Sequence, residues 1–217
     1  MKKYIVELIG TFALVLCGTG TIVINDVTNG MVSNVGIAIS FGLIVASMIY
    51  AFENISGAHI NPAVSIAFYM TDRFDKKDLL GYIIAQLSGA FLASGTLKLL
   101  FAEHKHLGAT IPNGEWHQSF ILEIILTYLL MIVILYVSQY KATKPFTGLA
   151  IGSIVLLEAW YAGPITGASM NPARSIAPAI VSGNINELWI YIIAPIMGAI
   201  MASLTWKLIN KRSKKLA

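Results

Sequence analysis

The 217-residue sequence has few charged residues and a single cysteine. Charged side chains make up 12% of it and hydrophobic residues 56%, whereas soluble domains contain about 25% charged residues. Because Cys17 is the only cysteine, an internal disulfide and a cysteine-based metal site are excluded. The GxxxxGK, HExxH, CxxC and nucleophile-elbow motifs are also absent. Nothing in the sequence therefore indicates an enzyme, a resident metal or a cofactor.

The hydrophobic residues are gathered in long stretches that resemble membrane spans. Four stretches lack charge entirely, at 8–25, 27–52, 79–97 and 188–206, and two more hold one acid each, at 119–139 and 145–163. A spanning helix needs about 20 mostly apolar residues. We therefore predict an all-α membrane protein with six spans, the first covering 4–25. Glu7 interrupts the apolar run at the N-terminus, so a cleaved signal sequence is not expected.

The formal net charge of +4 is distributed unevenly along the chain. With six spans, the two termini and the connections near 72–77 and 140–144 share one side, and they carry most of the lysines and arginines. The opposite connections, near 26–32 and 102–118, hold only Lys105. Since basic loops stay in the cytoplasm, this pattern predicts a multi-pass protein of the inner (plasma) membrane with both termini cytoplasmic. It does not indicate a nucleic-acid partner.

The sequence contains an internal repeat. "GAHINPAVSIA" at 57–67 matches "GASMNPARSIA" at 167–177 at eight of eleven positions, and "YIIAQLSGA" at 82–90 matches "YIIAPIMGA" at 191–199 at six of nine. Each repeat, approximately 1–105 and 118–217, holds three spans. Because three is odd, the second repeat must lie inverted in the membrane, as in channels and transporters. We expect one channel domain over 1–217.

Two Asn-Pro-Ala motifs, Asn61-Pro62-Ala63 and Asn171-Pro172-Ala173, open short apolar segments. The segments 62–70 and 172–180 would form about 13 Å of helix, less than half of a bilayer core of about 30 Å. They are predicted to be re-entrant half-helices that enter from opposite faces. Asparagine caps helix N-termini and proline suits the first helical position. We expect the two asparagine NH2 groups to be free to donate to a passing solute.

The meeting of two half-helices has an electrostatic consequence. Each helix N-terminus carries roughly half a positive charge, so a path between them repels cations and protons. Arg174 lies about 4.5 Å farther outward along its half-helix, where the other repeat has Val64. Arginine at this depth usually faces a water-filled cavity. Arg174 is predicted to act as an outer filter, with a structural cap for loop carbonyls as the alternative.

Several other polar residues stand out. Glu7 and Glu123 are related by the repeat and are expected to anchor the re-entrant loops, although a proton relay is an alternative. His59 is predicted to line the cytoplasmic pore mouth, with a gating role as the alternative. Glu158 has no repeat-related acid and could line the pore or pair with a neighbouring donor. Three loop histidines are expected to be solvated rather than to bind a metal: His104, His106 and His117.

Both Asn-Pro-Ala motifs, the glutamates in the first and fourth spans, "SGAHINPAV" and Arg174 together resemble the aquaporin, or major intrinsic protein, family. The resemblance implies a right-handed bundle of six transmembrane helices plus two re-entrant half-helices, one pore per subunit, and a homotetramer. It also places a selectivity filter at Phe41, Ala159, Ala168 and Arg174. The two alanines imply a wider, more apolar constriction than that of a strict water channel.

Three further segments, "AGPITGASMNPARSIAPA", "SFILEIILTYLLM" and "LWIYIIAPIMGA", resemble the nodulin-like intrinsic proteins of plants and their bacterial relatives. That subgroup often has Trp or Gly where this chain has Phe41. The resemblance implies a passive channel for water, glycerol and neutral metalloid hydroxides such as arsenous, boric or silicic acid, excluding protons and ions. The alternatives are a strictly water-selective aquaporin, a secondary active transporter and a structural adhesion protein.

Overall fold

The computed structural model describes residues 1–216, with side chains described up to Asn210. The side chains of four basic residues used in the topology prediction therefore lie outside the described part: Lys211, Arg212, Lys214 and Lys215. The described chain folds into α-helices and one short 3₁₀ helix, η1. In chain order these are α1 (Lys2–Val27), α2 (Ser33–Ser56), α3 (Pro62–Met70), α4 (Lys76–Leu100), α5 (Trp116–Val137), η1 (Lys144–Phe146), α6 (Thr147–Thr166), α7 (Pro172–Ser182) and α8 (Leu188–Leu216).

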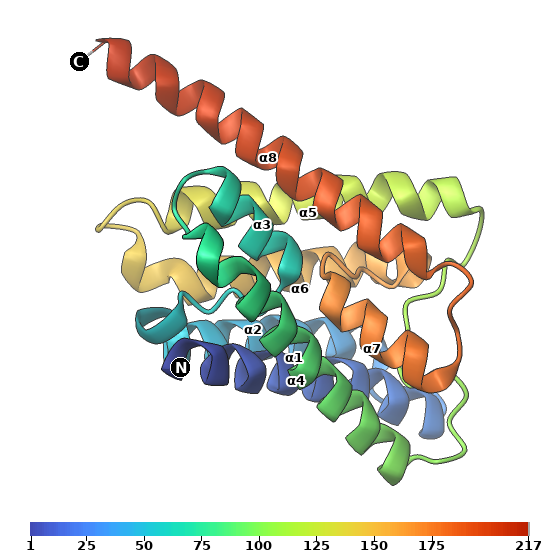
Figure 1. Cartoon of the computed structure of the whole chain (residues 1–217). Helices are drawn as coiled ribbons and strands as arrows, with labels where there is room; N and C mark the ends of the chain where they lie inside the picture. Colours follow the sequence, from blue (N-terminus) through green and yellow to red (C-terminus); the bar gives the residue numbers. More distant parts are fainter. Residues whose placement is uncertain (217) are drawn as a thin grey trace.

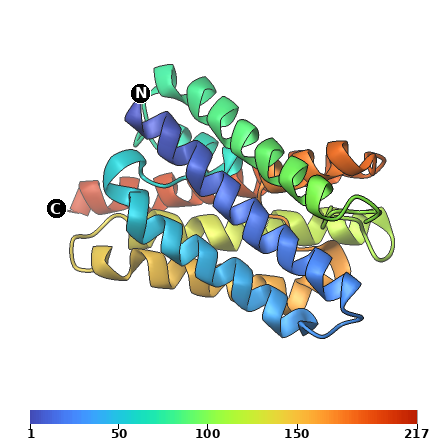
Figure 2. The same ribbon diagram turned by 90° about the horizontal axis from the view of Figure 1, so that it is seen from below.

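Six of the helices in the described part are long and apolar enough to cross a membrane, as predicted. The half-helix α3 has the predicted bounds, and α7 continues two residues past its predicted end, to Ser182. The two half-helices enter the bundle from opposite ends, and the N-terminus lies at the same end as the last turns of α8 (Figures 1 and 2). This arrangement places each half-helix N-terminus in the interior.

Glycines allow the long helices to cross closely. A Cβ atom added at Gly42 of α2 would lie 2.6 Å from the Gly152 carbonyl oxygen of α6, and one added at Gly152 would lie 2.5 Å from the Gly42 oxygen. Such backbone proximity is typical of small residues at membrane helix contacts. Gly42 and Gly152 are separated by the 110-residue repeat offset, so the two helices meet at equivalent positions.

The other two close crossings are also paired. At Gly89, α4 packs so tightly on α1 that a Cβ atom would overlap the Leu8 carbonyl oxygen, and at Gly198, α8 packs in the same way on Ile124 of α5. Matched contacts of this kind are what a duplication would produce, and the boundaries of the two repeats stay a prediction.

The lipid-facing surface carries exposed leucine and isoleucine side chains, such as Leu43, Leu80 and Ile121.

Candidate functional site

The N-termini of the two half-helices are capped by the asparagines of the Asn-Pro-Ala motifs. The side-chain oxygen of Asn61 accepts a hydrogen bond from the Ala63 amide at 2.9 Å, and that of Asn171 accepts one from the Ala173 amide at 3.0 Å. Proline occupies the first position of each helix, where its missing N–H leaves nothing unsatisfied. The caps agree with the sequence prediction.

The asparagine NH2 groups also join the two loops to each other. Asn61 Nδ2 donates to the Met170 carbonyl at 2.8 Å, and Asn171 Nδ2 donates to the Ile60 carbonyl at 2.9 Å. The expectation that both NH2 groups are free is therefore wrong in part. Because an amide NH2 carries two protons, one proton of each asparagine still remains for a solute. The exchange also holds the two half-helix ends together.

Glu7 anchors the first re-entrant loop from the interior of α1. Its carboxylate accepts hydrogen bonds from the His59 amide at 2.9 Å and the Ile60 amide at 2.7 Å. Ser56 Oγ at 2.6 Å and Gln86 Nε2 at 2.8 Å complete its partners. Ile60 has a positive φ of 43°, which is unusual for a β-branched residue. The bonds to Glu7 stabilise this otherwise costly backbone.

Glu123 of α5 makes the corresponding contacts with the second loop. It accepts hydrogen bonds from the Ser169 and Met170 amides, each at 2.8 Å, and from Thr166 Oγ1 at 2.6 Å. Met170 has a φ of 52°. Both glutamates are fully buried, and their oxygens accept from the loops. These contacts are those expected of loop anchors rather than of a proton relay.

Arg174 is 1% exposed and lies in the first turn of α7, three residues after the Asn171 cap. Its Nη1 donates to the Gly108 carbonyl at 2.8 Å, and its guanidinium carbon lies 5.1 Å from the centre of the Phe41 ring. Nε and Nη2 have no hydrogen-bond partner among the described residues. The side chain thus caps one loop carbonyl, as the alternative prediction held, and keeps two donor nitrogens unused.

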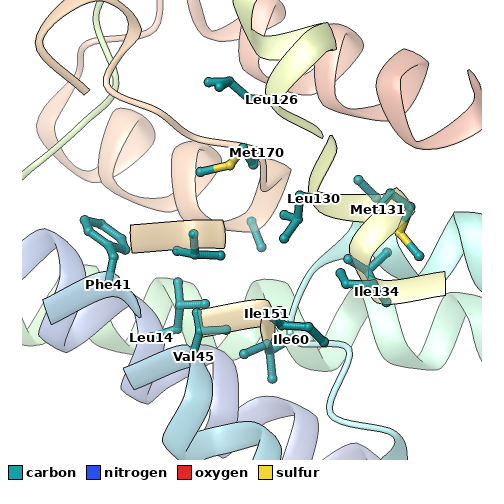
Figure 3. Close-up of a cluster of buried hydrophobic side chains, with 14 of the residues drawn as sticks. Leu14, Phe41, Val45, Ile60, Leu126, Leu130, Met131, Ile134, Ile151 and Met170 are labelled. Atoms are coloured by element: carbon teal, nitrogen blue, oxygen red, sulfur yellow. The ribbon is translucent and has the colours of Figure 1, made fainter. Parts of the chain in front are cut away.

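A cavity of about 80 Å³ runs from Phe41 and Arg174 past the two half-helix ends to His59, Ser138 and Thr147. Since one water occupies about 10–15 Å³ measured in this way, roughly five to eight waters would fit in it. All four predicted filter residues line it, together with Asn61, Asn171 and His59. Most of its wall is apolar, and Figure 3 shows part of that wall, including Leu14, Phe41, Val45, Ile60, Leu130, Ile134, Ile151 and Met170.

Comparison with known proteins agrees with this geometry. The family model "Major intrinsic protein" matches residues 1–206. The chain belongs to the major intrinsic protein family. It is 44% identical over 218 residues to aquaporin NIP1-1 of Zea mays, covering 100% of this chain and 77% of the relative. It is 43% identical over 219 residues to nodulin-26 of Glycine max, covering 100% and 81%. The predicted family and its nodulin-like subgroup are thereby confirmed.

A solved structure of the same family supports the fold. The X-ray structure of the aquaglyceroporin from Plasmodium falciparum superposes with a TM-score of 0.87 at 27% identity, covering 100% of this chain and 99% of that one. The predicted fold class, an all-α bundle of spanning helices with two half-helices, is therefore confirmed.

The two other polar residues considered for the pore of this major intrinsic protein differ from each other in position: His59 lines the cavity and Glu158 does not. His59 lines the cavity, stacks on Phe68 with ring centres 4.7 Å apart, and its Nδ1 lies 3.0 Å from Ser65 Oγ. Glu158 is fully buried, is not among the cavity-lining residues, and has no hydrogen-bond partner within the described part of the chain. Neither of the roles considered for Glu158 has a contact to support it.

Sequence reasoning missed the contribution of the outer loop to this family member's cavity. The Gly108 carbonyl that meets Arg174 comes from a loop read only as polar and solvated. Gly108, inside the short Leu107–Thr110 segment, is a weak signal of unusual backbone. The apolar wall was also missed, because several residues on each helix were equally able to face the interior.

Proposed function

We propose that the chain is a passive channel for water and small uncharged solutes. The observation that carries this proposal is the narrow cavity between two capped half-helix N-termini, with Arg174 at its outer end. Members of this family are channels and not enzymes. A solute would pass an apolar wall and exchange its hydrogen bonds at a few fixed donors, namely the remaining amide protons of Asn61 and Asn171 and the guanidinium of Arg174.

Charge selection follows from the same groups. The two half-helix N-termini and the guanidinium each present positive charge to the path, and they would repel protons and cations. A secondary active transporter would instead need carboxylates facing the substrate. Glu7 and Glu123 are not among the cavity-lining residues, and their oxygens accept bonds from the loops. The contacts thus favour a channel over a coupled transporter.

The proposed filter consists of Phe41, Ala159, Ala168 and Arg174. Methyl side chains at the two alanine positions leave room for a solute larger than water, such as glycerol or a neutral metalloid hydroxide. The name aquaglyceroporin of the Plasmodium falciparum structure, and the name aquaporin of the maize relative, support both water and glycerol as solutes. A strictly water-selective channel is less compatible with two alanines.

The proposal includes an assembly and a location. We infer a homotetramer in the plasma membrane with both termini in the cytoplasm. The start of α1 and the α3–α4 and α5–η1 connections lie at the same end of the bundle (Figure 1). These segments carry most of the basic residues of the described part, namely Lys2, Lys3, Arg73, Lys76, Lys77, Lys141 and Lys144, and this supports the orientation. Cross-linking of the protein in membranes would test the tetramer.

Proteoliposomes provide the direct test of transport. Stopped-flow light scattering would compare the permeability to water, glycerol, urea and arsenous acid with that of protein-free vesicles. We expect faster water and glycerol equilibration and no proton leak above background, measured with an entrapped pH dye. Proton conductance comparable to solute flux would contradict the exclusion mechanism, and accumulation above equilibrium would favour a coupled transporter.

A further inference from the structure

The loop between α4 and α5 passes along the end of the bundle opposite the N-terminus (Figure 1). From this loop, the Gly108 carbonyl accepts from Arg174 at 2.8 Å and Thr110 Oγ1 donates to Ser175 Oγ at 2.8 Å. The Asn113 amide donates to the Ile165 carbonyl at 2.9 Å. The loop therefore contacts both α6 and α7 and supplies the hydrogen-bond acceptor of Arg174.

The backbone that presents the Gly108 carbonyl is unusual. Leu107 and Gly108 have φ values of 50° and 70°, and left-handed conformations are uncommon for residues other than glycine. Leu107 is fully buried, and a Cβ atom at Gly108 would lie 2.8 Å from the Thr19 carbonyl oxygen. This turn therefore needs specific contacts to persist.

His104 supplies such contacts. Its ring Nδ1 accepts hydrogen bonds from the Leu107 amide at 3.0 Å and the His106 amide at 3.3 Å. On the other side of the ring, Nε2 lies 3.3 Å from Asp26 Oδ2 at the end of α1. The side chain is 8% exposed, so the expectation of a solvated loop histidine is wrong for His104. His106 and His117 are exposed, as expected.

We propose that His104 is a positioning residue for Arg174: its neutral ring holds the 104–108 turn, and the turn holds the Gly108 carbonyl against the guanidinium. Asp26 fixes the ring from α1, so the end of the first helix is connected through His104 to the filter in the other half. When this connection is lost, the Arg174 guanidinium loses the Gly108 carbonyl, its only hydrogen-bond acceptor among the described residues. The freed guanidinium then extends into the cavity and obstructs larger solutes.

The same geometry makes the connection sensitive to pH. A ring that accepts at Nδ1 carries its proton on Nε2, and a doubly protonated imidazole has no acceptor left. Histidine side chains in general change charge between about pH 5 and 8. A surface hollow lined by Asp26, Glu103, Lys105 and His106 gives solvent access to His104, and Lys98 binds the nearby Ala102 carbonyl. The charged and titratable groups around the ring are Asp26 at the end of α1, Lys98 at the end of α4, and Glu103, Lys105 and His106 in the loop.

The inference rests on the proposed channel function, and flux measurements separate the two. In oocytes that express the protein, glycerol and water permeability would be measured at external pH 7.5 and 5.5. We expect the His104→Ala variant to lower the glycerol-to-water permeability ratio about five-fold at pH 7.5, the effect of losing about one hydrogen bond's free energy. Wild-type protein at pH 5.5 should approach the same ratio. Absence of any flux in wild type would refute the channel, not the role of His104.

Conservative variants distinguish positioning from general loop stability. In His104→Asn, the amide oxygen can still accept from backbone N–H groups two and three residues on, but it does not titrate. We expect this variant to keep the wild-type ratio at both pH values. His117→Ala, also on the outer side but without contact to the turn, should retain the wild-type pH response.

Three results would overturn the inference: a wild-type ratio in His104→Ala, a pH response that persists in His104→Asn, or a response lost in His117→Ala. If His104→Ala does not reach the surface, which antibody labelling would show, the comparison of wild type with His104→Asn still decides. The lowered ratio would then have to appear in wild type alone at pH 5.5.

Discussion

The half of the molecule that carries Glu7 and the half that carries Glu123 hold their loops in the same way but place different residues beside them. Tyr82 donates to the Ser56 carbonyl and Tyr191 to the Thr166 carbonyl, each at 2.7 Å. By contrast, Val64 of the first half corresponds to Arg174 of the second. The anchoring contacts are thus repeated, whereas the groups that would select a solute occur once.

Two further pairs of equivalent positions hold different residues. His59 corresponds by the 110-residue offset to Ser169, and Met48 to Glu158. The outer loop that reaches Arg174 connects the two halves and so has no counterpart inside either one. Symmetry therefore builds the narrow path, and the single connection between the halves makes its outer end chemically different from its inner end.

The largest effect is expected at the paired helix crossings. Alanine at Gly89 or at Gly198 would force a Cβ atom into a backbone carbonyl, and we expect either change to destabilise the fold by about 3 kcal/mol. The survival of folded protein after heating, followed by size-exclusion chromatography, measures this. Gly95→Ala, also in α4 but with no atom within 4 Å of the added Cβ, is the control. Equal behaviour of Gly89→Ala and Gly95→Ala would remove the packing argument.

The loop anchors should respond equally in the two halves. In Glu7→Gln and Glu123→Gln, the new NH2 group must face one of the two loop amides, which orphans one buried backbone donor. We expect a loss of about 1–3 kcal/mol in each variant, measured as a lower thermal midpoint. Glu187→Gln, at an exposed glutamate, should leave the midpoint unchanged. A strong effect in only one half would show that the two anchors are not equivalent.

Replacing the filter arginine by the residue at its repeat position tests the asymmetry directly. Arg174→Val should keep water flux and raise proton or cation leak at least about ten-fold, corresponding to about 1.4 kcal/mol of lost repulsion. An entrapped pH dye in proteoliposomes measures the leak. Arg174→Lys keeps the positive charge and should leak less than the valine variant. If the valine variant excludes protons as well as wild type does, exclusion depends on the half-helices alone.

The smallest effect is expected at Glu158. Because this carboxyl group is buried without a partner among the described residues, replacement by methionine, the residue at its repeat position, should stabilise the protein by about 1 kcal/mol. Flux should change by less than about two-fold, since the residue is not in the cavity wall. The thermal midpoint and stopped-flow rates measure both. A large loss of flux in Glu158→Gln would instead assign Glu158 to the path.

Much of this architecture could be predicted because it rests on local chemistry. Asn followed by Pro specifies a helix start at Asn61 and Asn171, and nine apolar residues are too few to span a bilayer. Glu7 and Glu123 were recognisable because buried acids require donors. The family resemblance, rather than spacing, gave the filter positions, and those residues do line the cavity.

The parts that could not be predicted depend on contacts distant in sequence. Nothing near Asn61 indicates that its NH2 group meets the Met170 carbonyl, 109 residues away. His104 resembled any histidine in a polar loop, because its acceptor role depends on the left-handed turn at Leu107. The repeat offset does relate Gly42 to Gly152, but it does not predict that they are in contact, because glycines are common in membrane helices.

The exchange of asparagine hydrogen bonds also determines when the pore can be completed during synthesis. The Asn61 amide and the Ile60 carbonyl find their partners at Met170 and Asn171. At about 5–20 residues per second, roughly 5–20 s separate the synthesis of these two segments. During that interval the first loop can bind Glu7, but its hydrogen bonds to Met170 and Asn171 cannot yet form. The pore therefore closes around its midpoint only after the second half enters the membrane, and a chain truncated before Met170 should contain a half-helix but no finished path.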